Sequence, residues 1–196
     1  KRAELSSKQA SLLRILALIL ALAAGGIFIA CLGQNPFMVY ATIVSGSFRS
    51  TMAVQAMVKI MIPLLIASLG VTVAFKMQFW NIGAEGQIIF GAIFASFFAL
   101  FTPDIPRPVL IIIMFTAGAA GGGLWGLLPA IFKVKYNTNE TLFTLMLNYI
   151  AFDLIVFLRD GPWRDPANPG FSKIATFGTN AQLPTVFGVH IGWIIA

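Results

Sequence analysis

The stretch Phe79-Trp80-Asn81-Ile82-Gly83-Ala84-Glu85-Gly86-Gln87 decides how this chain can fold. It places two amides, a carboxylate and two glycines between two apolar runs, Ile60 to Phe75 and Ile88 to Phe101, neither of which carries a charge. In a soluble domain this stretch would be a surface loop. In a bilayer its polar groups must face a protein cavity or a pathway, because lipid cannot solvate them.

The composition indicates a membrane protein. Hydrophobic residues make up 58% of the 196 residues and charged residues 10%, whereas soluble domains carry about 25% charged residues. Two further charge-free runs, Ile15 to Phe48 and Pro108 to Phe132, are longer than the ~20 residues that cross a bilayer core. We therefore predict an all-α integral membrane protein, a polytopic helical bundle.

The apolar runs predict about six spans. We expect them at residues 12–32, 54–75, 83–101, 109–132, 141–158 and 186–196, the last one truncated. A signal peptide is the alternative for the first run, but no clear small-residue cleavage site leads into a polar mature domain, which favours a retained helix. Because Lys1 is not a start methionine and Ala196 lies inside an apolar run, we expect residues 1–196 to be the N-terminal part of a longer transmembrane domain.

The basic residues separate apolar runs and do not form one patch, so the net charge of +6 does not indicate a nucleic-acid partner. They read as topology signals and predict a cytoplasmic N-terminus, with Asn137 inside and Ser172 outside. The single Cys31 excludes an internal disulfide, and no cysteine and histidine cluster suggests a metal site.

The run Ile88 to Phe101 corresponds to about 21 Å of helix, which is short of the ~30 Å hydrocarbon core. Either the helix begins at Gly83, or the segment is a broken, partly re-entrant element. Both options draw the polar motif into the membrane, whereas a third has Glu85 merely capping the span at the inner surface. We expect six residues to line a substrate pathway or to support the helix break: Asn81, Gly83, Glu85, Gly86, Gln87 and Asn148.

Two other groups of residues have expected roles. Asn139 and Glu140 precede the span 141–158 and could form a cytoplasmic-side gate or a helix cap, with Asn137 or Thr138 as alternative caps. Thr141, Thr144, Asn148 and Phe152 share a helical face that should meet protein. Asp153 could pair with Arg159 or reach water. The four-residue spacing of Gly118, Gly122 and Gly126 predicts close helix packing.

Three motifs resemble one family. Phe79 to Gln87 closely resembles the Phe-Asn-Ile-Gly-Ala-Glu-Gly-Gln signature of permease subunits from bacterial ABC importers, with Trp80 as an insertion-like departure. The branch is the one for nucleosides and simple sugars, related to the branched-chain amino acid permeases. The segments Asn139 to Ala151 and Gly161 to Pro166 are similar to that branch as well.

The resemblance implies a permease subunit, and so a transport component that is not itself an enzyme. ATP and Mg would be bound by separate cytoplasmic ATPase subunits, since the chain has no Walker motif and no cofactor is expected in it. The other implied partners are a second permease subunit, an extracytoplasmic solute-binding protein and the lipid of the bacterial cytoplasmic membrane. The coupling loop to the ATPase would follow the sixth span.

Two other functions remain open at this point. An ion-coupled secondary transporter also uses broken helices at mid-membrane, and Glu85 could bind a proton or a cation. A membrane-embedded enzyme is disfavoured, because the chain has the single histidine His190 and neither an HExxH nor a GxSxG motif. Asn81, Gln87 and Asn148 offer amides, which suit uncharged, hydroxyl-rich ligands.

Overall fold

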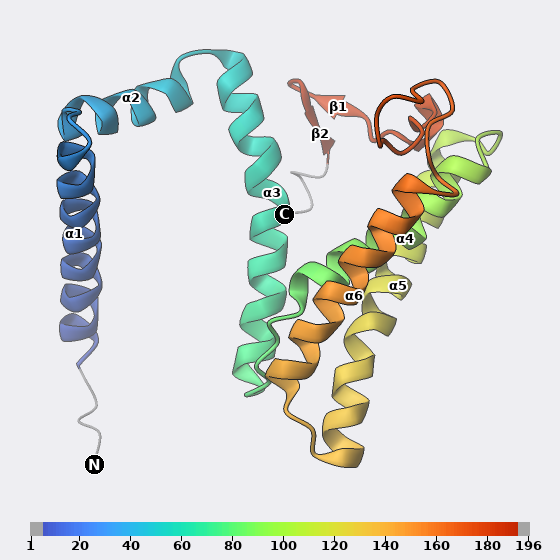
Figure 1. Ribbon diagram of the computed structural model, residues 1–196, viewed down its shortest axis with the longest axis horizontal. Helices are drawn as coiled ribbons and strands as arrows, with labels where there is room; N and C mark the ends of the chain where they lie inside the picture. The colour runs from blue at the N-terminus through green and yellow to red at the C-terminus, as the bar shows by residue number, and fades with distance from the viewer. Residues whose placement is uncertain (1–5, 192–196) are drawn as a thin grey trace. The chain divides into compact units, whose positions relative to one another are not determined.

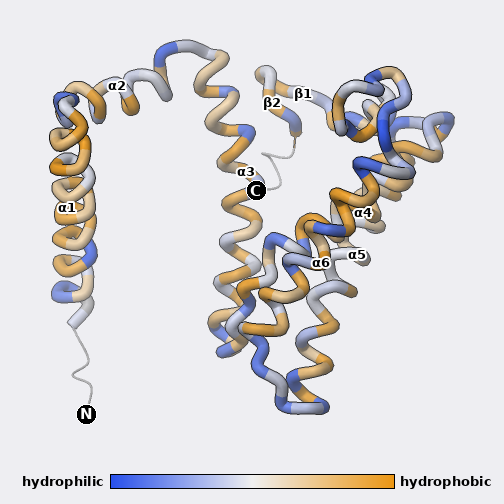
Figure 2. Tube along the Cα trace, viewed as in Figure 1, coloured by the Kyte–Doolittle hydropathy of each residue, from blue (hydrophilic) through white to orange (hydrophobic). Residues whose placement is uncertain are grey.

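The computed structural model describes residues 6–191. Five of the helices in this part are long and apolar enough to cross a membrane, and this confirms the prediction of an all-α polytopic membrane protein. Figure 2 shows the apolar colouring along these helices. The helices are α1 (Ser7–Cys31), α2 (Pro36–Phe48), α3 (Thr51–Lys76), α4 (Ala84–Phe101), α5 (Arg107–Tyr136) and α6 (Glu140–Asp160), with α2 as the shorter one.

The chain divides into two compact units, Lys1–Val58 and Lys59–Ala196, and the division falls inside α3. In the first unit, Asn35 caps α2 by accepting hydrogen bonds from the backbone N–H groups of Phe37 and Met38. The Tyr40 hydroxyl donates to the Leu22 carbonyl over 2.7 Å and thereby ties α2 to α1.

The second unit is built on the pairing of α4 with α5, against which α6 also packs (Figure 1). Glycines allow this close approach. A Cβ atom at Gly91 would lie 2.8 Å from the Gly118 carbonyl oxygen, and one at Gly122 would lie 3.1 Å from the Gln87 carbonyl oxygen. A Cβ at Gly126 would lie 2.9 Å from Gln87 Nε2. The three glycines singled out in the sequence therefore all lie on the face of α5 that meets α4.

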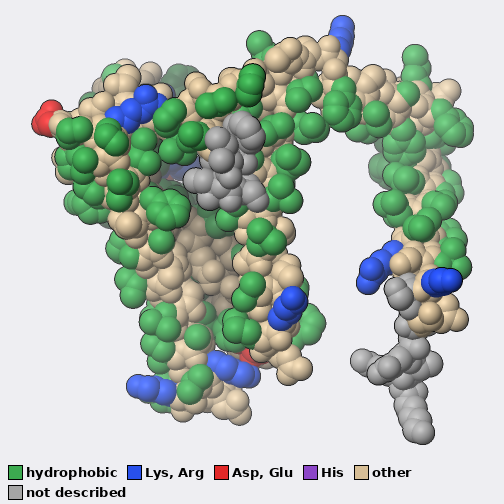
Figure 3. All heavy atoms as spheres, turned by 180° about the vertical axis from the view of Figure 1, so that it is seen from behind, with side chains coloured by type: hydrophobic (Ala, Val, Ile, Leu, Met, Phe, Trp, Pro, Cys, Tyr) green, Lys and Arg blue, Asp and Glu red, His purple; other side chains and the backbone are tan. Residues whose placement is uncertain are grey.

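Basic side chains gather at one end of this unit (Figure 3). Lys133 and Lys135 lie in the last turn of α5, and Lys76 ends α3. The opposite end carries the segment that follows α6, which folds over the ends of α4 and α5 (Figure 1). Arg107 Nε donates to the Gln182 carbonyl over 2.9 Å, and Asn180 Nδ2 donates to the Pro103 carbonyl over 3.1 Å.

The prediction of a sixth span is wrong for its described residues, which form a hairpin and not a helix. Strand β1 (Thr185–Val186) pairs in antiparallel fashion with β2 (Val189–His190). The two residues between them, Phe187 and Gly188, have φ values of 53° and 74°. Positive φ at both central positions is the requirement of a tight two-residue hairpin turn, so the glycine after Phe187 favours the turn over a helix start. Residues 192–196 of the expected span lie outside the described residues.

We predict that Gly91→Ala destabilises the protein while Gly123→Ala does not. The methyl group at position 91 meets a backbone oxygen, and overpacking of this kind costs ~1–3 kcal/mol. Gly123 has no atom within 4 Å of an added Cβ, so alanine there gains helix propensity of up to about 1 kcal/mol. Thermal unfolding of the full-length permease in detergent measures both. Equal melting temperatures for the two variants would contradict this packing.

We also predict an acid transition in the segment after α6. Asp165 accepts hydrogen bonds from Asn168 Nδ2 and from the backbone N–H of Ala167, and these bonds lower the pKa of its carboxyl group. Because the folded pKa lies below the unfolded one, the stabilisation is present above about pH 4 and is lost as the pH falls through the folded pKa.

A fluorophore on a cysteine placed at the exposed Phe171, in a Cys31→Ala background, should therefore lose anisotropy in acid. The matched control, Asp165→Asn, removes the titrating group and should remove the step. A step of equal size in this control would assign the transition to another group.

Candidate functional site

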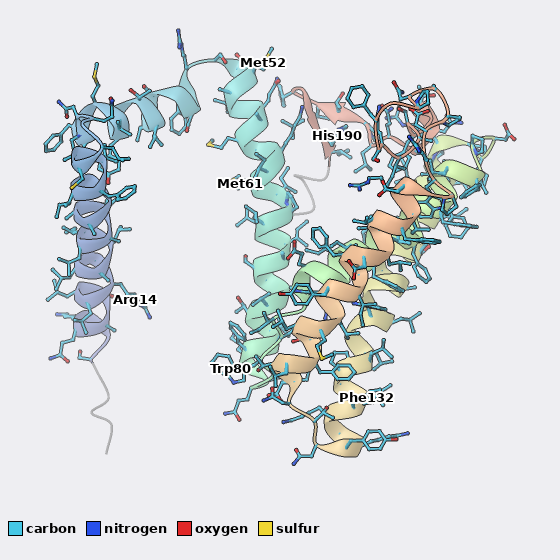
Figure 4. The ribbon with its side chains drawn as sticks, in the orientation of Figure 1. Arg14, Met52, Met61, Trp80, Phe132 and His190 are labelled. Carbon is cyan, nitrogen blue, oxygen red and sulfur yellow. The ribbon has the colours of Figure 1, made fainter. Side chains whose placement is uncertain are left out.

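The site centres on the break between α3 and α4. Helix α3 ends at Lys76, Gln78 has a φ of 56°, and the backbone stays non-helical up to Gly83. Asn81 Oδ1 accepts a hydrogen bond from the Gly83 N–H over 2.8 Å. Trp80 lies beside the end of α3 (Figure 4), and its ring centroid is 5.4 Å from that of Phe75. The polar motif thus contains a helix break followed by the first turn of α4.

Helix α6 holds this break in place. Asn148 Oδ1 accepts from the Gly86 N–H over 2.8 Å, while Asn148 Nδ2 donates to the Ile82 carbonyl over 3.0 Å. Thr144 Oγ1 accepts from the Ile82 N–H over 3.2 Å. The first turn of a helix has N–H groups without intrahelical partners, and Gly83 at the N-cap has no side chain to accept from them. Asn148 supplies that acceptor from a neighbouring helix.

Gly83 and Gly86 are required by this contact. A Cβ at Gly83 would lie 2.9 Å from Thr144 Cβ, and one at Gly86 would lie 2.7 Å from Asn148 Oδ1. Both glycines are buried, as is Thr144 at 1% exposure. Any side chain at either position would push α6 away from the break. Phe152, expected on the same face as Thr144, is instead 50% exposed, because the buried stripe continues through Leu147 to Ala151.

Trp125 of α5 completes the junction, and sequence reasoning missed it. Its ring stacks on Phe90 of α4 with centroids 4.0 Å apart. Its Nε1 atom would lie 3.2 Å from a Cβ at Gly86, and it is buried without a hydrogen-bond partner among the described residues. Its position among glycines was the one available signal, since a large ring there must fill space that the glycines leave.

A groove runs beside the break, between α3, α4 and α5. One cavity of about 360 Å³ is lined by Gly70, Asn81, Gln87 and Gly122, among others. A second, of about 410 Å³, shares Gly70, Asn81 and Gln87 with the first. The polar side chains that line the two cavities are the amides of Asn81 and Gln87. Such a surface can exchange hydrogen bonds with a neutral ligand but offers it neither a nucleophile nor a charge.

Glu85 lies apart from both features. It is exposed in the first turn of α4, where a carboxylate is favoured by the helix dipole. Within residues 6–191 it has no hydrogen bond or ion pair. The structure therefore brings Asn81, Gly83, Gly86 and Asn148 together at the break and places Gln87 in the groove, while Glu85 is exposed and takes part in neither.

The connection from α5 to α6 carries the remaining candidates. Asn139 is the N-cap of α6, and its Oδ1 accepts from the Leu142 N–H over 3.2 Å. Asn137 instead ends α5 in the left-handed conformation, so neither it nor Thr138 caps α6. Glu140 pairs with Lys133 at 2.8 Å across the turn. Among the described residues no group of three or more His, Cys, Asp and Glu side chains could hold a metal ion.

We predict that Asn148→Leu loosens the junction more than Thr144→Val. The first change leaves the part-buried N–H of Gly86 and the exposed carbonyl of Ile82 without partners, and an unpaired buried group costs ~1–3 kcal/mol, whereas the second removes one acceptor. Thermal unfolding of the full-length permease should show both losses in this order. Asn148→Asp keeps the acceptor for Gly86 and should fall between the wild type and Asn148→Leu. An unchanged melting temperature in Asn148→Leu would contradict the bracing role.

Comparison with known proteins agrees with the three sequence motifs. Residues 52–196 match the family described as branched-chain amino acid transport system / permease component. A glucose ABC transporter permease protein of Haloferax volcanii is 30% identical over 91% of this chain and 46% of its own length. A nucleoside ABC transporter permease protein of Lactococcus lactis is 31% identical over 75% of this chain and 40% of its own.

A guanosine ABC transporter permease protein of Bacillus subtilis is also 31% identical over 75% of this chain, and 42% of its own length is covered. The chain thus spans less than half the length of these curated relatives. No solved structure gives a significant match. The extent of the family match, together with the membrane helices and the braced polar motif, shows that this multi-pass membrane chain belongs to the family of branched-chain amino acid transport system permease components.

Proposed function

We propose that this chain forms part of the permease of an ATP-driven importer for a small polar solute such as a nucleoside or a simple sugar. The observation that carries the proposal is the similarity to permeases whose names specify glucose, nucleosides and guanosine, which extends over 75–91% of the chain. These solutes are neutral and rich in hydroxyl groups, and they are too polar to cross a bilayer without a protein pathway.

The groove beside the break supports this proposal. Its volume falls in the range of ~300–1,000 Å³ that is usual for small-molecule sites. The amides of Asn81 and Gln87 supply both donors and acceptors on its wall. A site built from such groups discriminates against analogues that lack the matching hydroxyl, because its own polar atoms are then left unpaired. We therefore assign Asn81 and Gln87 to the solute pathway, with Asn148 holding the wall in position.

The proposal includes partners. Separate ATPase subunits would bind ATP and Mg, a solute-binding protein would deliver the solute, and a second permease subunit would complete the pathway. The membrane would be the bacterial cytoplasmic membrane with the N-terminus inside, which puts the Lys133–Glu140 pair on the cytoplasmic side. There Asn139 and Glu140 would stabilise the inner end of the α5–α6 connection and act as part of a gate.

Uptake measurements in cells that express the full-length permease with its genomic neighbours test this function. Uptake of labelled guanosine or glucose should require an intact ATPase and should persist when an ionophore collapses the proton gradient. Uptake that stops with the ionophore and continues without the ATPase would instead identify an ion-coupled transporter. A cysteine at Asn137 should resist an impermeant thiol reagent added outside, while one at Ser172 should react.

We predict that Glu85→Gln reduces uptake severalfold while the complex still assembles. Glu85 has no hydrogen bond or ion pair among the described residues. It lies in the first turn of the apolar helix α4, so we propose that it lines the pathway or contacts a partner subunit. The matched control is Asp104→Asn, which changes an exposed carboxylate in the α4–α5 turn and should leave uptake unchanged. Normal uptake in both Glu85→Gln and Asn81→Ala would remove this motif from the pathway.

A further inference from the structure

Helix α6 has a second face, opposite the one that braces the break. Thr144, Leu147 and Ala151 are the buried residues of α6. On the opposite side the spacing i, i+4, i+7 and i+11 aligns Leu142, Met146, Tyr149 and Asp153 in one stripe. Tyr149 and Met146 are each 65% exposed, and Asp153 is exposed as well. This stripe, defined here as residues 142, 146, 149 and 153, combines apolar side chains with a phenol and a carboxylate.

The carboxylate lies well inside the span. Leu154 to Leu158 form an uninterrupted apolar run between Asp153 and the charged end of α6. Asp153 is therefore about 10 Å from Asp160 along the helix axis, at ~1.5 Å per residue. The rings of Phe101 and Trp163 lie 6.5 Å apart, which sets the end of α4 close to the turn that follows α6. An aspartate side chain is too short to reach water from this depth past that run, unlike a lysine or arginine.

The basic residues closest to Asp153, at the C-terminal end of α6, form hydrogen bonds with other groups. Arg159, the expected partner of Asp153, instead contacts the neighbouring Asp160 through two hydrogen bonds of 2.8 and 3.0 Å. Arg164 donates to the carbonyl of Pro169. Asp153 has no hydrogen bond or ion pair within residues 6–191. A carboxylate at this depth that faced lipid would be strongly unfavourable, so its face must meet water or protein.

We propose that this stripe of α6 forms a wall of a water-filled solute pathway, and that Tyr149 and Asp153 contact the solute. The proposal rests on the transport function and assigns to it two residues outside the polar motif. Their face of α6 lines neither cavity beside the break, so the stripe would form a stretch of the pathway separate from the groove of Asn81 and Gln87. The two oxygens of a carboxyl group can each form a hydrogen bond, which matches a pair of neighbouring hydroxyl groups. An exposed tyrosine ring one turn away presents an apolar face against which a sugar or base ring can pack. The solute class is a neutral ring compound with adjacent hydroxyl groups.

Cysteine accessibility tests the inference in the full-length permease in native membrane vesicles, with Cys31 replaced by alanine. Single cysteines at Met146 and Asp153 should react with a membrane-impermeant thiol reagent, because a thiolate forms in water but not in lipid. The matched controls are Leu145 and Phe152. Each is adjacent in sequence to a test position and exposed, but lies about 100° further round the helix. We expect labelling at 146 and 153 to be about tenfold faster than at 145 and 152.

Protection of the cysteine by bound solute then distinguishes a residue that contacts the solute from one that is only exposed to water. Guanosine or glucose, whichever the permease transports, should slow the labelling of the cysteine at 153 severalfold. Asp153→Asn should raise the KM for uptake more than it lowers the maximal rate, and Phe152→Leu should change neither. An unreactive cysteine at 153, with a reactive cysteine at Ser172 as a positive control, would show that protein covers the stripe and would overturn the proposal.

Rapid labelling of 153 without protection by either solute would also overturn the solute contact. Neither of these results depends on the energy source. An importer driven by ions would still show labelling at 146 and 153 with protection by its solute, whereas an ATP-driven importer with a protein-covered stripe would not. The failure of this inference and the failure of the proposed function therefore give different results.

Discussion

One side chain, the amide of Asn148, satisfies two backbone groups at the point where the chain leaves helical geometry. It accepts from the N–H of Gly86 and donates to the carbonyl of Ile82. Where lipid surrounds a segment, no solvent can take over such bonds, so an irregular segment is tolerated there only where protein supplies the partners. At the break between α3 and α4 these partners come from α6. The position of α6 and the path of the polar motif are set by the same two hydrogen bonds.

The other features of the second unit follow from that contact. Gly83 and Gly86 must lack side chains so that Thr144 and Asn148 can reach the backbone. The glycines of α5 bring α4 close enough for Trp125 to stack on Phe90 beside the junction. Gln87 lies where α4 packs against α5, and together with Asn81 it lines the groove next to α3. The break is thus braced mainly by Thr144 and Asn148 of α6, whereas Asn81 and Gln87 of the motif line the groove.

The sequence was sufficient for the membrane class and for most of the helices, because apolar runs and charge placement depend on local composition. It also identified Asn148, but not its partners, since a side-chain bond between residues 62 and 66 positions apart depends on how helices pack. Gly91 was missed for the same reason. It looks like any glycine in an apolar run until Gly118 is placed against it. The hairpin at 185–190 was missed because two valines and a glycine suit either an apolar helix start or a tight turn.

Hydrogen exchange at the Gly86 amide tests the bracing of the break most directly. An N–H in the first turn of a helix, with no acceptor of its own, exchanges rapidly when water can reach it. In the full-length permease in lipid nanodiscs, the Gly86 amide should exchange slowly, and Asn148→Ala should make it exchange rapidly while amides in the middle of α4 stay protected. A Gly86 amide that exchanges at the same rate with and without Asn148 would contradict the brace.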